Sequence, residues 1–143
     1  MAERLATTVW EGDLPKGQGT VNGASGALAD LGVTWASRTE RSNGQTSPEE
    51  LIAAAHSSCF AMAFSNELSQ TGHDPERLEV TAKVTLDQQD GAPTVTASEL
   101  TVSGQVPGLD QGQFEQAAQT AGENCPISRA LAGVAITVTA TLK

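Results

Sequence analysis

The feature that most constrains the fold is a helical signal that begins at Ser47. Ser47 is a suitable N-cap, Pro48 takes the first helical position, and Glu50 is placed to close a capping box. Helix-forming residues follow without a break until Gly72 supplies a stop signal. A helix over about 48–70 is about 33 Å long at about 1.5 Å per residue. We expect this helix to be the spine of the domain.

The rest of the chain is typical of antiparallel strands with two further helices. Alternating apolar and polar residues predict strands, and Asp90-Gly91 predicts a hairpin turn. Because the strands come in runs, we expect an α+β fold with antiparallel sheets around the long central helix. We expect a single domain over 1–143. It begins with a β-meander at about 4–38, which includes an extended stretch at Gly32–Arg38, and continues with the central helix at about 48–70. A β-hairpin at about 78–106, two helices at about 111–132 and a final strand at about 134–142 follow.

Composition and charge exclude several classes of function. The formal net charge of -9 repels nucleic acid and anionic membranes, so we expect neither as a partner. The longest apolar-rich segment, residues 51–64, is interrupted by His56 and two serines, which argues against a membrane span. We expect no export signal, and hence a cytoplasmic location in which static disulfides are rare. With three Phe, two Trp and no Tyr, the chain is a candidate for sharing its core with a partner chain.

Cys59 lies in the middle of the predicted helix, on an apolar stripe with helical spacing. The other members of that stripe are Leu51, Ile52, Ala55, Met62 and Ala63. One interpretation is structural: Cys59 is an inert core residue, and burial raises its pKa. The alternative is a reactive cysteine whose thiolate is stabilised by a charged partner from a loop.

Cys125 precedes Pro126 and is expected at or near a helix N-terminus. The amide groups there lower the pKa of a thiol, so local reasoning favours Cys125 as the nucleophile. The structural alternative is a cysteine that only caps a turn. A zinc site made by His56, Cys59 and Cys125 would need a fourth ligand that the sequence does not offer, and there is no Cys-x-x-Cys motif. We therefore expect no metal site and two free thiols.

Charged residues near the start of the predicted helix are the candidate partners of Cys59. Arg38 and Arg41 precede the helix, and either could place a guanidinium beside a thiolate. The alternative for each arginine is a solvated surface charge. Glu50 is assigned to the capping box, which leaves Glu49 as the carboxylate available for function.

Residues 47–63 (SPEELIAAAHSSCFAMA) and 124–128 (NCPIS) form a widely spaced pair of cysteine motifs. The pair resembles the core helix and the second cysteine motif of the osmotically inducible protein C family. Three N-terminal segments, Trp10–Asp13, Gly17–Val21 and Arg38–Glu40, resemble the osmotically inducible branch rather than its sister branch, the organic hydroperoxide resistance proteins. The resemblance covers nearly the whole chain.

The resemblance implies an intertwined homodimer with central helices, sheets built from both chains, and alkyl hydroperoxidase activity at the dimer interface. It also implies that Cys59 is the peroxidatic cysteine and that Cys125 is the resolving cysteine. Arg38 matches the activating arginine and Glu49 its carboxylate partner, with Arg41 as the alternative arginine. No bound cofactor is implied, and the expected reductant is an external dithiol of the lipoyl type.

The predicted function is therefore the reduction of organic hydroperoxides to alcohols through a Cys59 sulfenic acid and a Cys59–Cys125 disulfide. A peroxide-responsive redox sensor and a non-catalytic stress-binding module are the alternatives. Glu49 and Cys59 are ten residues apart on the predicted helix, about 15 Å along its axis and about 80° apart in direction. One guanidinium cannot easily bond to both groups of one chain, so either the site combines two chains or the helix is broken near its start.

Overall fold

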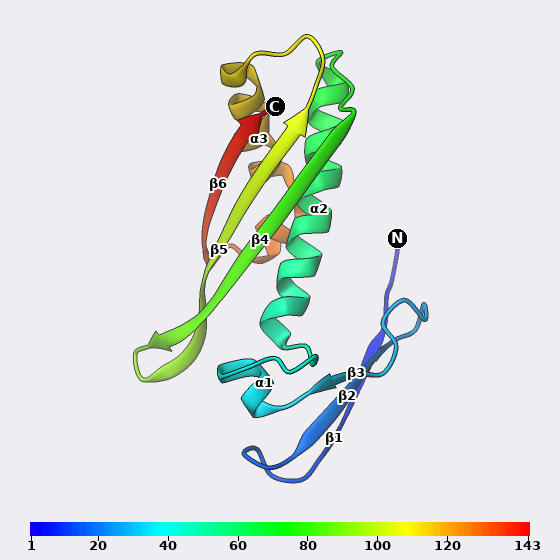
Figure 1. The fold of residues 1–143 in the computed structure, drawn as a ribbon, viewed down its shortest axis with the longest axis vertical. Helices are drawn as coiled ribbons and strands as arrows, with labels where there is room; N and C mark the ends of the chain where they lie inside the picture. The colour runs from blue at the N-terminus through cyan, green and yellow to red at the C-terminus, as the bar shows by residue number, and fades with distance from the viewer. The chain divides into compact units, whose positions relative to one another are not determined.

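The boundary between two structural units falls inside one long helix. The structure, a computed structural model, describes all residues 1–143. The contacts within the chain divide it into unit 1, Met1–Leu51, and unit 2, Ile52–Lys143. Helix α2 (Pro48–Gln70) contributes its first turn to unit 1 and the remainder to unit 2 (Figure 1). The expectation of a single domain over 1–143 stays a prediction.

Unit 1 contains a small antiparallel sheet. Its strands β1 (Ala6–Glu11), β2 (Gln18–Gly23) and β3 (Leu31–Val33) lie in the order β1-β2-β3. A short helix, α1 (Trp35–Thr39), follows the last strand. The expectation of an extended stretch over Gly32–Arg38 is therefore wrong from residue 35 onward.

Helix α1 forms because a capping box closes at its start. The hydroxyl of Thr34 accepts a hydrogen bond from the N–H of Ser37 at 3.0 Å. The hydroxyl of Ser37 accepts one from the N–H of Thr34 at 2.9 Å. These two bonds satisfy N–H groups that a short helix leaves free, and they outweigh the strand preference of the local sequence. As a result, Arg38 lies in the last turn of α1.

The start of α2 is capped by Ser47, but the expected capping box is only half formed. The hydroxyl of Ser47 accepts a hydrogen bond from the N–H of Glu50 at 3.1 Å. The carboxylate of Glu50 accepts a hydrogen bond from the hydroxyl of Thr46 at 2.5 Å instead of closing the box. Glu50 thus has a structural partner, as expected, although it is a different one.

Unit 2 contains a second three-stranded sheet, in the order β4-β5-β6. The hairpin of β4 (Arg77–Gln89) and β5 (Ala92–Gln105) turns at Asp90-Gly91, where both residues have positive φ. Helices α3 (Gln111–Asn124) and α4 (Pro126–Ala130) then lead to β6 (Ala135–Leu142). Strand β6 runs parallel to β5, because these helices form a crossover that returns the chain to the start of β5. The α+β fold class is confirmed, with this one parallel pairing in an otherwise antiparallel arrangement.

Helices α2 and α3 contribute to one hydrophobic core on one face of this second sheet. The rings of Phe64 on α2 and Phe114 on α3 lie 4.9 Å apart, centroid to centroid. Phe114 packs directly over Gly104 of β5, where an added Cβ would lie 2.7 Å from the ring. A residue without a side chain is therefore needed at 104. Among the helices, none combines the length and the hydropathy that a membrane-spanning helix needs.

The stripe of α2 that is buried differs from the expected one. Its fully buried members lie at i, i+4 spacing: His56, Phe60, Phe64 and Leu68. Of the expected stripe, Ala55 and Met62 are exposed, and Cys59 is only half-buried. Two phenylalanines remove more apolar surface from water than alanines do, so they decide which face turns inward. Cys59 consequently lies at the edge of the core.

Candidate active site

Cys59 and Cys125 lie together in unit 2, although they are far apart in the sequence. Cys59 belongs to α2, and Cys125 lies at the junction of α3 and α4. Their sulfur atoms are 3.1 Å apart, and both are free thiols. Cys125 is completely buried, whereas Cys59 is half-buried. A small molecule from solvent can therefore meet Cys59 but not Cys125.

The two thiols have opposite pKa shifts. Burial raises the pKa of Cys59, and the hydrogen bond and charge of Cys125 raise it further, against a smaller effect of the Ile127 backbone. Burial also opposes ionisation of Cys125, but hydrogen bonds outweigh it and lower the pKa of that thiol. In order of effect, these bonds come from the Ser128 backbone, Cys59, the Ser128 side chain and the Ile127 backbone.

The thiol of Cys125 therefore ionises more readily than that of Cys59. The backbone N–H groups at the start of α4 point to Cys125, as its position before Pro126 predicts. The thiol that ionises more readily is thus the inaccessible one, and the accessible thiol is the one that ionises less readily. Cys59 needs a further positive charge nearby before it can react as a thiolate.

His56 lies one turn before Cys59 on α2 and is fully buried. Its Nδ1 is 2.7 Å from the hydroxyl oxygen of Ser98 on β5, and its Nε2 is 2.8 Å from the hydroxyl oxygen of Ser128 on α4. Burial lowers the pKa of His56, so its ring is neutral at ordinary pH. Both ring nitrogens are therefore engaged with serines.

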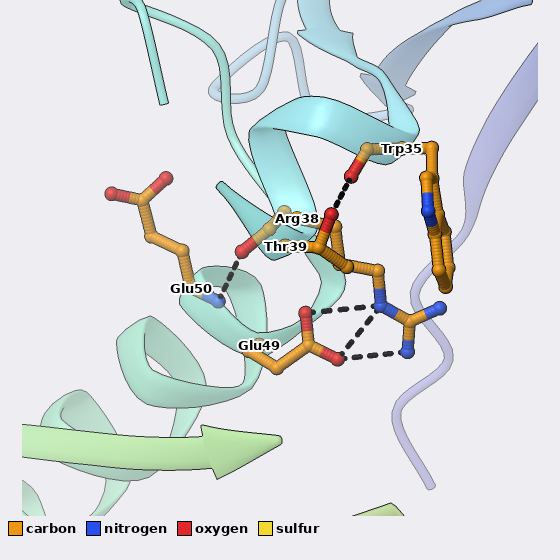
Figure 2. A network of polar contacts seen from close by, with 6 residues as sticks. Trp35, Arg38, Thr39, Glu49 and Glu50 are labelled. Atoms are coloured by element: carbon orange, nitrogen blue, oxygen red, sulfur yellow. Dashed lines mark hydrogen bonds and ion pairs between the residues drawn. The ribbon is translucent and has the colours of Figure 1, made fainter. Parts of the chain in front are cut away.

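Arg38 and Glu49 form an ion pair in unit 1 (Figure 2). Nη2 of Arg38 donates to Oε1 of Glu49 at 2.8 Å, and its Nε lies 3.0 and 3.2 Å from the two carboxylate oxygens. The Arg38 side chain is 31% exposed and that of Glu49 is 9% exposed. Arg41, by contrast, is exposed and makes no ion pair. A half-buried, fixed guanidinium is better suited than a solvated one to hold an anion.

An apolar cavity of about 370 Å³ lies beside Arg38 within unit 1. Its apolar lining residues are Trp10, Leu14, Val21, Val33, Trp35, Pro48 and Leu51. The guanidinium carbon of Arg38 is 5.9 Å from the ring centroid of Trp35, which lies beside it in Figure 2. The cavity thus combines one cation with mostly hydrophobic walls.

The structure brings the four site residues expected from the sequence together in two pairs. Cys59 lies against Cys125 in unit 2, and Arg38 against Glu49 in unit 1. Sequence reasoning missed the two serines around His56, because nothing local marks a single serine on a strand or a short helix. It also missed the position of Trp35, because the residues around it favour a strand whereas Trp35 begins the short helix α1.

A family model and a curated relative point to one family. The family model described as OsmC-like protein matches residues 41–140. The chain is 41% identical to peroxiredoxin OsmC of Escherichia coli over 122 residues, which is 85% of each chain.

Solved structures share the fold. An organic hydroperoxide resistance protein of Elizabethkingia anophelis superposes with a TM-score of 0.76 at 23% identity, covering 100% of this chain and 98% of that one. The organic hydroperoxide resistance protein OhrB of Bacillus subtilis superposes with a TM-score of 0.70 at 23% identity, covering 97% and 98%. On the family model and the curated relative, the chain belongs to the OsmC-like protein family.

Proposed function

We propose that this protein is a two-cysteine peroxidase that reduces organic hydroperoxides to alcohols. The observation that carries the proposal is the pair of free thiols with sulfur atoms 3.1 Å apart, one accessible and one buried. An accessible sulfur can attack a peroxide, and a buried neighbour can then capture the oxidised product. The relative in Escherichia coli is itself named a peroxiredoxin.

The reaction has three balanced steps. The Cys59 thiolate attacks the peroxide oxygen distal to carbon, the O–O bond breaks, and the alkoxide leaves and takes up a proton as the alcohol. Cys59 is then a sulfenic acid. The sulfur of Cys125 attacks the sulfur of Cys59, which forms the disulfide and releases water. An external dithiol returns both cysteines to thiols and is itself oxidised to a disulfide.

Arg38 is assigned the role of holding Cys59 as a thiolate during the first step. This role follows from the raised pKa of the Cys59 thiol, which leaves the accessible sulfur protonated unless a cation is added. Glu49 holds the guanidinium in a fixed direction, because its Oε1 accepts from Nη2 and its Oε2 accepts from Nε of Arg38. The cavity beside Arg38 gives the alkyl group of the substrate an apolar surface, which favours organic hydroperoxides over hydrogen peroxide.

The proposed active form is a homodimer in which the site combines two chains. Helix α2 is unbroken from Pro48 to Gln70, so Glu49 and Cys59 of one chain are about 15 Å apart along its axis. All of β1 is exposed in the isolated chain, including the apolar Val9, and so is Met62 of α2. In the proposed homodimer, the partner chain would cover these exposed apolar residues.

Repeated turnover tests the proposal. The protein should consume cumene hydroperoxide over many cycles with dihydrolipoamide as the reductant, and it should use hydrogen peroxide less efficiently. Consumption is followed as loss of hydroperoxide, with a Cys59→Ser variant as the blank. One equivalent of oxidation without further consumption, despite excess dithiol, would instead indicate the redox sensor. No oxidation at all would leave the non-catalytic binding module.

A further inference from the structure

A buried histidine that the proposed reaction does not use joins three elements of unit 2. His56 on α2 is completely buried, and each of its ring nitrogens has one serine partner. Nδ1 lies 2.7 Å from the hydroxyl oxygen of Ser98 on β5, and Nε2 lies 2.8 Å from that of Ser128 on α4. A serine hydroxyl can donate or accept, so both contacts are hydrogen bonds whichever ring nitrogen carries the proton.

The contact between His56 and Ser128 neighbours the contact between the two sulfur atoms. His56 and Cys59 are three residues apart on α2, so they occupy adjacent positions on the surface of that helix. Cys125 and Ser128 are also three residues apart, and they share the first turn of α4, in which the N–H of Arg129 donates to the carbonyl of Cys125 at 3.1 Å. Two contacts therefore connect α2 with this turn, at 2.8 Å between His56 and Ser128 and at 3.1 Å between the sulfur atoms.

Helix α4 depends on such contacts because it is short. It has only five residues, and a helix of that length is marginal without tertiary packing. Ile127 packs against the core, but apolar packing is not directional. Ser128 is the residue of α4 whose side chain hydrogen-bonds to another element. Loss of its bond to His56 would therefore loosen the turn that carries Cys125.

We propose that His56 is a positioning residue for the disulfide: anchored on Ser98 and bonded to Ser128, it holds the first turn of α4 so that the two sulfur atoms can bond. The inference rests on the proposed function, because it concerns the step in which Cys125 attacks the Cys59 sulfenic acid, forms the S–S bond and releases water. The sulfur atoms must approach from 3.1 Å to about 2.05 Å. Misplacement of a reacting group by about 1 Å can cost about 100-fold in rate, so a loosened α4 slows this step.

The first experiment measures the pairing of the thiols without peroxide. The reduced protein is equilibrated with glutathione and glutathione disulfide, and two exchange steps form the Cys59–Cys125 disulfide and release two molecules of glutathione. The equilibrium gives the effective concentration of one protein thiol at the other. We expect it to fall by about tenfold or more in His56→Phe and in Ser128→Ala, as positioning is lost. Ser128→Thr keeps the hydroxyl and should stay near wild type, because a cavity of about 530 Å³ beside Ser128 has room for the added methyl group.

Two further variants separate positioning from stability. Val102→Ala leaves a gap in the core under β5 but keeps both contacts, so it should lower the Tm and leave the effective concentration unchanged. Ser98→Ala removes the anchor of the ring on the sheet and should have a smaller effect than His56→Phe, because the bond to Ser128 remains. Circular dichroism confirms folding, and Ser128→Ala decides the outcome if His56→Phe unfolds. An unchanged effective concentration in the folded variants, or an equal fall in Val102→Ala, would overturn the proposal.

The second experiment separates a failure of this inference from a failure of the proposed function. Rapid mixing with cumene hydroperoxide resolves the oxidation of Cys59 from the formation of the disulfide. His56→Phe should keep the first rate and slow the second by about tenfold or more, with more Cys59 sulfinic acid in excess peroxide. If peroxide does not oxidise the wild-type protein, the proposed function fails, and the glutathione equilibrium alone decides the role of His56. Equal slowing of both steps, or an unchanged second step, would contradict that role.

Discussion

At the residue scale, reactivity depends on how readily a thiol ionises and on how accessible it is, and the structure assigns these two properties to different cysteines. Cys125 has the lowered pKa but is sealed in the core, and Cys59 has the raised pKa but reaches the surface. If Cys59 is the attacking sulfur, a cation must act on it. The ion-paired Arg38 is the candidate that geometry favours over the solvated Arg41.

We predict that Arg38→Ala slows the oxidation of Cys59 by about 100-fold, the cost of removing one fixed electrostatic contact in an active site. Arg41→Ala should change the rate by no more than about threefold, because an exposed charge contributes little. The rate of Cys59 alkylation against pH, measured in a Cys125→Ser background, should move to higher pH only in Arg38→Ala.

Stability must be separated from activation in this comparison. Arg38→Ala leaves the carboxylate of Glu49 buried without its partner, which costs about 1–3 kcal/mol, less than in a fully buried pair because solvent reaches the Arg38 side. The double variant Arg38→Ala/Glu49→Gln removes that unpaired charge and should fold better while remaining as slow. A pH profile that is unchanged in both variants, or one that moves in Arg41→Ala instead, would contradict the assignment of Arg38.

The directions of the two thiol pKa shifts could be predicted from the sequence, because the surroundings of each cysteine can be read locally. The raised pKa of Cys59 follows from its place on an apolar helix, and the lowered pKa of Cys125 follows from its place before Pro126. The partners of His56 could not be predicted. Ser98 comes from a strand 42 residues further along the chain, and only tertiary packing brings its hydroxyl to the ring.

At the scale of elements, the sequence signals at the start of α2 predicted where this helix begins. The pattern of apolar residues did not predict which face of the helix is buried. The Ser47-Pro48 signal places the start of α2 at residue 48. The buried face of α2 is the one that carries the two phenylalanines. Side-chain volume in the core, rather than the count of apolar residues, decides which face is buried. The turn of α1 was missed, since its Thr34–Ser37 capping box lies among residues that favour strands.

Because α2 is unbroken between Glu49 and Cys59, it leads to a prediction about these two residues. Subunit exchange between Cys59→Ser and Glu49→Ala should restore activity, because in the proposed homodimer a site made by two chains is complete once in each mixed dimer. Activity would recover to about a quarter of wild type, since about half of the dimers are mixed and each has one of two sites. The measurement is hydroperoxide turnover after exchange.

The matched control mixes Cys59→Ser with Cys125→Ser. The two sulfur atoms are 3.1 Å apart within one chain, so no mixed dimer has a complete pair and no activity should return. If the Glu49 mixture also stays inactive although exchange is demonstrated by mass, then Glu49 does not serve Cys59 of the partner.

At the scale of the whole molecule, the candidate site residues fall into two groups, one on each unit. Unit 1 holds the guanidinium, its carboxylate and the apolar cavity, and unit 2 holds both thiols and the buried His56. The sequence predicted the fold class, because strand runs and turns are local signals. It could not predict the parallel strand β6, which depends on how the α3–α4 crossover returns the chain.

The most direct test of this account is the intact mass of the protein after one equivalent of cumene hydroperoxide, with dimedone as a trap for sulfenic acid. The wild-type chain should lose two hydrogens as the Cys59–Cys125 disulfide forms. Cys125→Ser should gain one dimedone adduct at Cys59, and Cys59→Ser should keep its starting mass. If Cys59→Ser is oxidised at Cys125 while Cys125→Ser is not oxidised, the buried thiolate attacks first and the proposed order of the two cysteines is wrong.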